Sequence, residues 1–305
     1  MKEASDKDIF AIYHASEDFE DAVRSHKVAN ASASSNRIHL TKLDLTNQND
    51  VDKFFKSQEE SFDICFHLAA HSSPRACHAD PESAKLINVP SIFIEKLKDT
   101  PVIALSTDQV YDGKSSNPYE ETNEAGPLNV YAQTKLDLEK LLLSSNERSR
   151  PAICLRSSII LGPLAPFGGA HSTFLHFCQS REGEETTFFT DEIRSVVNVN
   201  DVIQTLLFFF YQMQKGTIDE LDSTVYNMGG PDASSRMEMA VAVAKQLSFQ
   251  NHEKYFIPAK KAEQNLSVDS VLSPLNISMS SLKLEQLVGL KFQGLDSIVN
   301  QTFTS

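Results

Sequence analysis

Glycine is scarce in this chain, with 11 residues among 305 and none before Gly113. A turn that binds phosphate between a strand and a helix depends on glycines, because only they let the backbone approach the phosphate closely. The part of the chain before Gly113 therefore contains no sequence that could form a glycine-rich phosphate turn.

Cysteine and basic residues are also few. Cys65, Cys77, Cys154 and Cys178 show no Cys-x-x-Cys spacing and no paired histidines, which excludes a structural zinc site and predicts free thiols in a reducing compartment. We expect no metal. The formal net charge of −13 argues against nucleic acid or an anionic membrane as a partner, although a local basic pocket for an anionic substrate stays compatible with it.

Long apolar runs are absent. The longest, Leu206–Tyr211, is far too short to span a bilayer and predicts a buried helix instead. Met1–Lys7 is polar and charged, with no apolar segment of a signal peptide behind it. We therefore predict a soluble, cytoplasmic protein.

Short apolar segments alternate with helical patterns along most of the chain. The segments that predict strands are 9–13, 37–43, 62–68, 102–105, 152–155 and 225–228. Helices are predicted after a cap at Thr46, from Pro81 through Leu97, and after a capping box of Ser235 and Glu238. This alternation indicates an α/β fold.

Two stretches carry the chemistry. Ser106–Gly113 follows a predicted buried strand, so the Thr107 hydroxyl lies at the carboxyl edge where open α/β sheets bind ligands. Tyr131 and Lys135 share one face of a helix that Asn129 can cap. The ammonium would lower the pKa of the phenol, which could then protonate a carbonyl oxygen held by a hydroxyl. The Tyr–Lys spacing alone is weak evidence, and the strand-end hydroxyls strengthen it.

Five stretches together resemble the extended short-chain dehydrogenase/reductases: Ser106–Gly113, Pro118–Glu121, Pro127–Tyr131, Thr134–Lys135 and Glu139. Within that family they are most similar to the dTDP-4-dehydrorhamnose reductase branch, which includes the regulatory subunit of methionine adenosyltransferase. The resemblance runs from about residue 8 to residue 290 and is strongest over 102–140.

The resemblance implies roles for individual residues. Tyr131 would be the proton donor, Lys135 its partner and a ligand of the cofactor ribose, and Thr107 the hydroxyl that positions the substrate oxygen. The other implied cofactor contacts are Asp44, Leu45, Ala69 and Ala70, and the implied substrate contacts are Asp108 and Arg194. Arg194 could instead anchor the substrate lobe or be a surface charge. Asn88, which interrupts an apolar helix series, matches a position that supports the active-site helix.

The resemblance also implies a Rossmann-type, doubly wound parallel sheet with a small C-terminal substrate lobe. The cofactor domain would comprise 1–160 and about 191–230, and the lobe about 161–190 and 231–305. The family begins with a strand and a Gly-x-x-Gly-x-x-Gly turn, whereas the first strand here matches the family's second. Either the sequence is truncated or dinucleotide binding has been lost. The catalytic residues downstream favour truncation. Tyr13–Ser16 lacks the acidic residue that binds an NAD ribose, which favours NADPH.

These observations support an NADPH-dependent reductase of a nucleotide-linked 4-keto sugar. The alternatives are a non-catalytic regulatory subunit of the methionine adenosyltransferase type and a sugar-nucleotide epimerase. An intact Thr–Tyr–Lys set favours the reductase, and the missing phosphate turn favours the regulatory subunit. The expected partners are accordingly a nucleotide sugar and either a second copy of the chain or an adenosyltransferase.

Overall fold

A computed structural model of the chain describes residues 8–14, 21, 37–58, 61–144, 148–164, 172–264 and 270–304. These residues belong to two compact units, one of Met1–Glu60 with Leu164–Ser172 and one of Ser61–Pro163 with Thr173–Ser305. Ala15 and Ser16, which the sequence argument for NADPH used, lie outside the described residues.

The N-terminal unit contains a pair of parallel strands, β1 (Asp8–Tyr13) and β2 (Arg37–Lys42), followed by α2 (Gln48–Lys56). The helix buries Val51 and Phe54 on one face, as the apolar spacing predicts. Both predicted strands are confirmed.

The cap of α2 differs from the prediction. Asn47 is the N-cap, and its side-chain oxygen accepts hydrogen bonds from the backbone N–H groups two and three residues later. The predicted cap at Thr46 is wrong because the Thr46 hydroxyl donates to the Asp44 carboxylate at 2.7 Å. Asp44 thus takes the hydroxyl that would otherwise have capped the helix.

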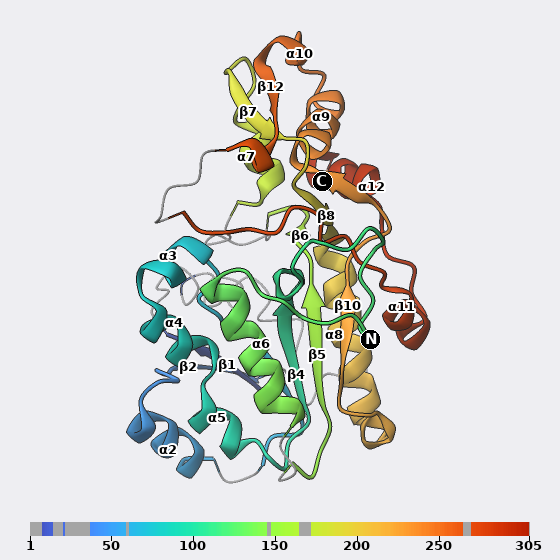
Figure 1. The fold of residues 1–305 in the computed structure, drawn as a ribbon. Coiled ribbons are helices and arrows are strands. Elements are labelled where there is room, and N and C mark those ends of the chain that lie inside the picture. Colours follow the sequence, from blue (N-terminus) through green and yellow to red (C-terminus); the bar gives the residue numbers. More distant parts are fainter. Residues whose placement is uncertain are drawn as a thin grey trace. The chain divides into compact units, whose positions relative to one another are not determined.

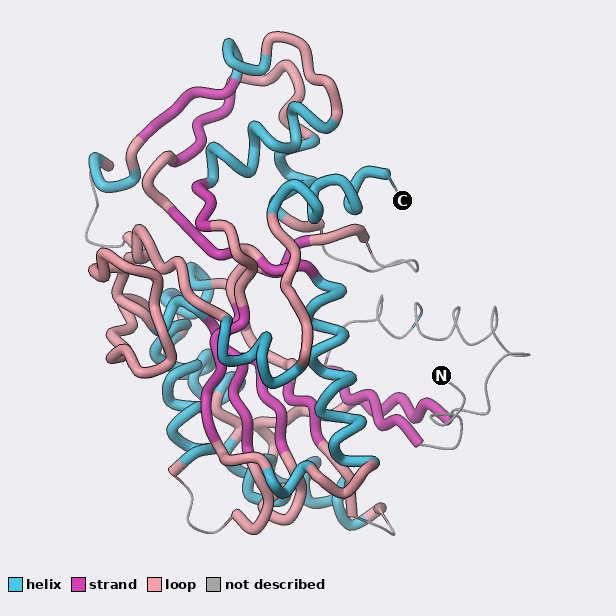
Figure 2. The backbone as a smooth tube through the Cα atoms, turned by 90° about the vertical axis from the view of Figure 1, so that its right-hand side faces the viewer, coloured by secondary structure: helices cyan, strands magenta, loops and turns pink. Residues whose placement is uncertain are grey.

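In the second unit, four described strands form a parallel sheet in the order β10-β5-β4-β3 (Figure 1). The strands are β3 (Cys65–His67), β4 (Val102–Thr107), β5 (Ala152–Ser157) and β10 (Thr224–Met228). Its helices are α3 (Pro74–Ala79), α4 (Pro81–Asn88), α5 (Ser91–Lys96), α6 (Val130–Leu143), α8 (Val199–Gln214) and α11 (Leu282–Val288). Helices lie on both faces of this sheet (Figure 2), which confirms the doubly wound α/β class.

Pro90 divides a helix that was predicted to be continuous. The segment predicted from Pro81 through Leu97 is two helices, α4 ending at Asn88 and α5 beginning at Ser91. Proline has no N–H to donate and its ring clashes with the preceding turn, so the helix cannot continue through it. The predicted start is confirmed, because the Asp80 carboxylate caps α4.

Helix α8 is amphipathic rather than fully buried. Phe209 is completely buried against the sheet, whereas Ile203, Leu207 and Tyr211 are 46%, 37% and 40% exposed. The apolar run therefore predicted the helix correctly but not its burial, because only one face of α8 packs on the strands.

The remaining elements of this unit form a smaller group at the top of Figure 1. They are β6 (Ile160–Leu161), β7 (Thr186–Phe189), β8 (Ile193–Ser195), β9 (Val197–Asn198), β11 (Ala233–Ser235), β12 (Phe256–Ala259), α7 (Phe174–Gln179), α9 (Arg236–Gln246), α10 (His252–Tyr255) and α12 (Leu295–Thr304). Three single 3₁₀ turns complete the description: η1 (Asp108–Val110), η2 (Ile218–Glu220) and η3 (Lys261–Glu263). An apolar cluster joins α7, α9 and α12, and the capping box at Ser235 is confirmed.

All four cysteines are free thiols, as predicted, and Cys65 is the one that is only partly buried. Among the described helices, none combines the length and apolar character that crossing a membrane requires. No group of three or more metal-ligating side chains occurs within the described ranges.

Candidate active site

The carboxyl end of β4 carries two buried polar side chains. Thr107 is the last residue of the strand, and Asp108 opens η1. The Thr107 hydroxyl donates to the Asp108 carboxylate and accepts from the Gln109 backbone N–H, both at 3.3 Å. Thr107 therefore lies at the sheet edge where its sequence position predicts it.

Helix α6 brings Tyr131 to the same strand end. Asn129 is the N-cap, as predicted, and its side-chain oxygen accepts from the Ala132 N–H at 2.9 Å. The Tyr131 phenol lies close enough to the Thr107 hydroxyl for that hydroxyl to lower its pKa. The structure thus unites two of the three predicted catalytic side chains, which are 24 positions apart in the sequence (131 − 107).

Burial dominates the electrostatics of Tyr131. It raises the pKa of the phenol to about 12, and the nearby Thr107 hydroxyl only partly opposes it. The charges of Asp108 and Cys77 would raise it further. The expected lowering of this pKa is wrong for the structure as described, because desolvation of a phenolate outweighs the favourable contacts.

Lys135 lies one turn further along α6 and is only 2% exposed. Burial lowers its pKa to about 8, against the charges of Cys154 and Glu139, which raise it. Its ammonium makes no hydrogen bond or ion pair with another residue that the structure describes. A buried cation without a direct partner is costly, and such groups are concentrated at functional sites.

Asp108 connects the strand end to the smaller group of elements. Its second carboxylate oxygen accepts from the Ser158 hydroxyl at 2.9 Å and lies 4.0 Å from Nε of Arg194. Burial raises the pKa of Asp108, while the Arg194 charge is the largest influence that lowers it. This carboxylate is therefore held in place by contacts from three segments of the chain.

Arg194 is buried, and its donors are occupied. It donates to the backbone carbonyls of Ile193, Pro274 and Leu275 at 2.7–2.9 Å, and more weakly to Ser273. These bonds tie β8 to the segment 273–275, which corresponds to the anchoring role that the sequence left open. Arg194 also lies 3.4 Å from the Glu192 carboxylate. Two partly exposed cations, Arg236 and Lys261, contact this same carboxylate.

The predicted cofactor residues lie in different units. Ala69 and Ala70 follow β3 in the second unit, where Ala69 is exposed and Ala70 partly buried. Asp44 and Leu45 follow β2 in the N-terminal unit. The Asp44 carboxylate accepts from the Thr46 hydroxyl and N–H, and these bonds lower its pKa.

Asn88 is a structural partner of α6 that the sequence only suggested. It is completely buried, donates to the Thr134 hydroxyl at 2.9 Å, and exchanges hydrogen bonds with the backbone of His71. An asparagine within an apolar helix series was the signal, because a buried amide must find partners.

His67 was not identified from the sequence as a distinct group. It is 3% exposed at the end of β3, and its Nε2 has no hydrogen-bond partner within the described part of the chain. Burial and the nearby Lys135 charge lower the pKa of His67 to about 3, so the imidazole is neutral. No periodicity in the sequence distinguishes this histidine from an ordinary strand residue.

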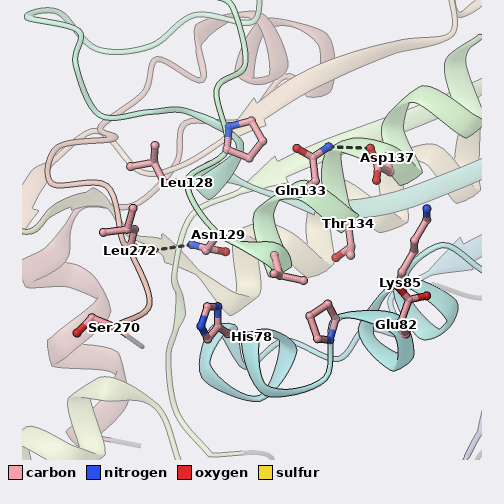
Figure 3. Close-up of a pocket in the computed structure, with 13 residues that line it drawn as sticks. His78, Glu82, Lys85, Leu128, Asn129, Gln133, Thr134, Asp137, Ser270 and Leu272 are labelled. Atoms are coloured by element: carbon pink, nitrogen blue, oxygen red, sulfur yellow. Dashed lines mark hydrogen bonds between the residues drawn. The ribbon is translucent and has the colours of Figure 1, made fainter. Parts of the chain in front are cut away.

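A groove of about 700 Å³ lies beside α6, as Figure 3 shows. Its walls come from α3, α4, the start of α6 and the segment 270–272, and the Asn129 amide donates across it to the Leu272 carbonyl. Thr107, Tyr131 and Lys135 are not among its lining residues. The groove is therefore separate from the side chains that could do chemistry.

The family model described as RmlD substrate binding domain matches residues 10–304. The chain belongs to this family.

Two relatives illustrate the range of the RmlD family. The beta subunit of methionine adenosyltransferase 2 from Xenopus laevis is 29% identical over 188 residues, which are 59% of this chain and 53% of that protein. The dTDP-4-dehydrorhamnose reductase of Aggregatibacter actinomycetemcomitans is 23% identical over 259 residues, 83% of this chain and 84% of that protein. The chain thus matches about half the length of the adenosyltransferase subunit.

Solved structures show the same fold. A dTDP-4-dehydrorhamnose reductase from Clostridium acetobutylicum superposes with a TM-score of 0.75 at 16% identity, covering 96% of this chain and 97% of that one. The Bacillus anthracis reductase in complex with NADP gives 0.71 at 15% identity, with coverages of 97% and 98%. MoeE5 in complex with UDP-glucose and NAD gives 0.72 at 18% identity, covering 97% of each chain. The RmlD-family fold therefore extends over nearly the whole chain.

Proposed function

We propose that this RmlD-family chain is an NADPH-dependent reductase of a nucleotide-linked 4-keto sugar. The observation that carries the proposal is the placement of Tyr131 beside the Thr107 hydroxyl at the carboxyl end of β4, with buried Lys135 one turn along α6. The name of the Aggregatibacter relative, which aligns with 83% of this chain, supports the substrate class.

The residues at the strand end have complementary tasks in such a reduction. The Thr107 hydroxyl holds the ketone oxygen, and Tyr131 transfers its phenolic proton to that oxygen, so that one O–H bond breaks as another forms. The Lys135 ammonium stabilises the phenolate that results. A bound nicotinamide cofactor would supply the hydride to the keto carbon. The raised pKa of Tyr131 keeps the phenol protonated until the substrate oxygen needs the proton.

The residues present fit the ribose and nicotinamide part of such a cofactor, but not its pyrophosphate. Lys135 has donors free for a ribose hydroxyl, and the exposed, small Ala69 leaves room beside the end of β3. The pyrophosphate half has no such support, because no glycine precedes Gly113. Relatives of this fold are described with NADP and with NAD. We favour NADPH, since the end of β1 lacks an acidic residue.

We extend the proposal to the other predicted contacts. Asp44 and Leu45 would flank the adenine, and Asp108 would contact the substrate. The cofactor domain would be 1–160 with about 191–230, and the lobe about 161–190 with 231–305. A cytoplasmic location agrees with the four free thiols, and a homodimer would suit the fold.

A regulatory subunit is the second candidate function. The alignment with the methionine adenosyltransferase subunit favours it, because that match spans 188 residues. In that role the same fold would bind a partner enzyme, and Tyr131 would not be needed for chemistry. An epimerase on a sugar nucleotide is the third candidate.

One experiment separates these functions. The chain would be mixed with NADPH and dTDP-4-dehydrorhamnose, and NADPH consumption and the sugar product would be followed. Because we expect weak cofactor binding, NADPH would be added in large excess, and we expect NADPH oxidation that matches the reduced sugar formed and that Tyr131→Phe slows about a hundredfold. A parallel sample with a methionine adenosyltransferase catalytic subunit would be analysed by sedimentation. Complex formation without NADPH oxidation would replace the reductase with the regulatory function, and a C4 epimer formed without net NADPH oxidation would indicate the epimerase.

A further inference from the structure

The interface between α6 and the sheet is polar. On β4 and β5, alternate residues such as Ile103, Ile153 and Leu155 pack on the α8 side. The residues between them face α6, and these include Ser106 and Arg156, which are paired across the two strands. Apolar side chains normally fill such an interface, so a polar layer here calls for a reason.

Glu139 is the centre of this layer. It is 2% exposed and accepts from the Ser106 hydroxyl at 2.5 Å, from Nη2 of Arg156 at 2.7 Å, and from Nε of Arg156 at 3.1 and 3.2 Å. Arg156 also donates to the Tyr111 hydroxyl at 3.0 Å, which in turn donates to Asn227 at 2.8 Å. The carboxylate is therefore fixed by side chains from two strands.

Lys135 lies four residues before Glu139, on the same face of α6. The ionisable groups that interact with it come from three elements: Glu139 on its own helix, His67 on β3, and Cys154 on β5 beside Arg156. Burial raises the pKa of the Cys154 thiol far above its ordinary value, so this thiol is uncharged near neutrality. Glu139 is then the negative charge that faces Lys135 within this described layer.

We propose that Glu139 is the counter-charge that keeps the Lys135 side chain protonated and oriented, and that Ser106 and Arg156 hold this carboxylate in place. Glu139 is thus a positioning residue, because it acts on the site through Lys135. A buried ion pair is often no more stabilising than apolar packing of the same volume, so packing alone gives no reason to retain it. The need to keep the Lys135 side chain protonated does give a reason for a charged residue at position 139.

The catalytic consequence rests on the proposed function, but the inference can be tested without it. The full 305-residue chain would be labelled with ¹³C-lysine, and the Lys135 resonance would be assigned by its loss in Lys135→Met. Its pH midpoint would be measured in the wild type and in Glu139→Gln. We expect the midpoint to fall by about one pH unit, a tenfold loss of proton affinity.

Two further variants separate this effect from a loss of structure. Glu139→Gln/Arg156→Met leaves neither charge unpaired in the layer, and we expect it to fold and to show the lowered Lys135 midpoint. Asp219→Asn removes a carboxylate from the exposed Arg150–Asp219 pair and should leave the midpoint unchanged. An unchanged midpoint in the folded double variant would overturn the proposal. So would failure of both Glu139 variants to fold, which would show that the pair is structural.

Because this readout needs neither cofactor nor substrate, its failure is distinct from a failure of the proposed function. If the chain is a reductase, Glu139→Gln should also move the fall in kcat at high pH to lower pH. A loss of kcat with the same pH profile would indicate a structural role and contradict the inference.

Discussion

Tyr131 combines properties that suit a proton donor. It is 9% exposed, it lies beside the Thr107 hydroxyl, and burial raises its pKa to about 12. In a chain with a complete cofactor site, we predict that Tyr131→Phe lowers kcat at least about a hundredfold, the usual scale for a general acid. Cofactor affinity should change little. Steady-state rates on a nucleotide-linked 4-keto sugar would measure this, with exposed Tyr211→Phe as the matched control. Near-normal turnover would remove Tyr131 from the mechanism.

Lys135 illustrates a conflict between function and stability. Its pKa is lowered to about 8 by burial, so the folded state disfavours the charge that the unfolded chain carries up to about pH 10.4. The resulting penalty is complete below about pH 8 and disappears as the pH rises towards 10.4. We predict that Lys135→Met raises the free energy of unfolding at pH 7 by about 1–3 kcal/mol, while it weakens cofactor binding and catalysis.

Urea denaturation at pH 7 and pH 10 would test this prediction for Lys135. The stabilising effect of the methionine should shrink at the higher pH. A variant that is less stable than wild type at pH 7 would show that the ammonium has favourable contacts that outweigh its burial.

His67 should make the protein sensitive to acid. Its pKa is lowered to about 3, whereas an unfolded histidine takes up a proton near pH 6.5. The folded state therefore loses stability as the pH falls from about 6.5 towards 3, because only the unfolded chain binds that proton. We predict that His67→Leu is more stable than wild type by about 2 kcal/mol at pH 5, and by less at pH 7.

The matched control for His67 is His78→Leu, since His78 is exposed on α3. Chemical denaturation of both variants at pH 7 and pH 5 gives the comparison. If the two substitutions showed the same pH dependence, the unpaired imidazole of His67 would not be the source of the acid sensitivity.

At the scale of elements, Asn129 both begins α6 and connects it to other segments. Its side-chain oxygen caps the helix, and its amide nitrogen donates to Gln109 at 3.1 Å and to the Leu272 carbonyl at 3.0 Å. Serine can still cap a helix but cannot make the two donor contacts. We predict a loss of about 1 kcal/mol for Asn129→Ser and about 2 kcal/mol for Asn129→Ala.

Urea denaturation measures both Asn129 variants. An equal loss would show that only the donor contacts matter and that the cap contributes nothing. Hydrogen exchange in the first turn of α6 would locate the difference, because the alanine variant alone frees the Ala132 N–H.

Local sequence patterns predicted which helices and strands form better than they predicted where each helix begins and ends. The strand before Thr107 and the cap at Asn129 follow from neighbouring residues, so the sequence located both. The cap of α2 is Asn47 and not Thr46, because the Thr46 hydroxyl donates to Asp44 instead. Sequence pattern does not show which of these two local hydrogen bonds is stronger. The break before α5 coincides with Pro90, a residue that cannot continue a helix.

The polar layer under α6 could not have been predicted. Its members come from three elements, and each has an ordinary explanation in its own segment. Glu139 could be a solvated helix residue, Arg156 the end of a strand and Ser106 a turn residue. Only the pairing of β4 with β5 places the last two beside each other and under the helix. Arg194 was found from the resemblance, but its occupied donors became visible only with segment 273–275 in place.

At the scale of the molecule, the described strands form separate sheets. Among the described strands, β1 pairs with β2 in the N-terminal unit, and β3 pairs with β4 in the second unit. The chain divides into two compact units, and no glycine precedes Gly113 to form a phosphate turn. We therefore predict that the 305-residue chain melts in more than one step and binds NADPH weakly.

Two extended versions would test this prediction about the whole chain. One would carry a strand, a Gly-x-x-Gly-x-x-Gly turn and a helix before Met1, and the other would have alanines in place of the glycines. Only the glycine version should bind NADPH tightly in calorimetric titration, since its backbone amides can reach the pyrophosphate. Micromolar binding and a single cooperative melt from the 305-residue chain itself would show that neither the strand nor the turn is needed.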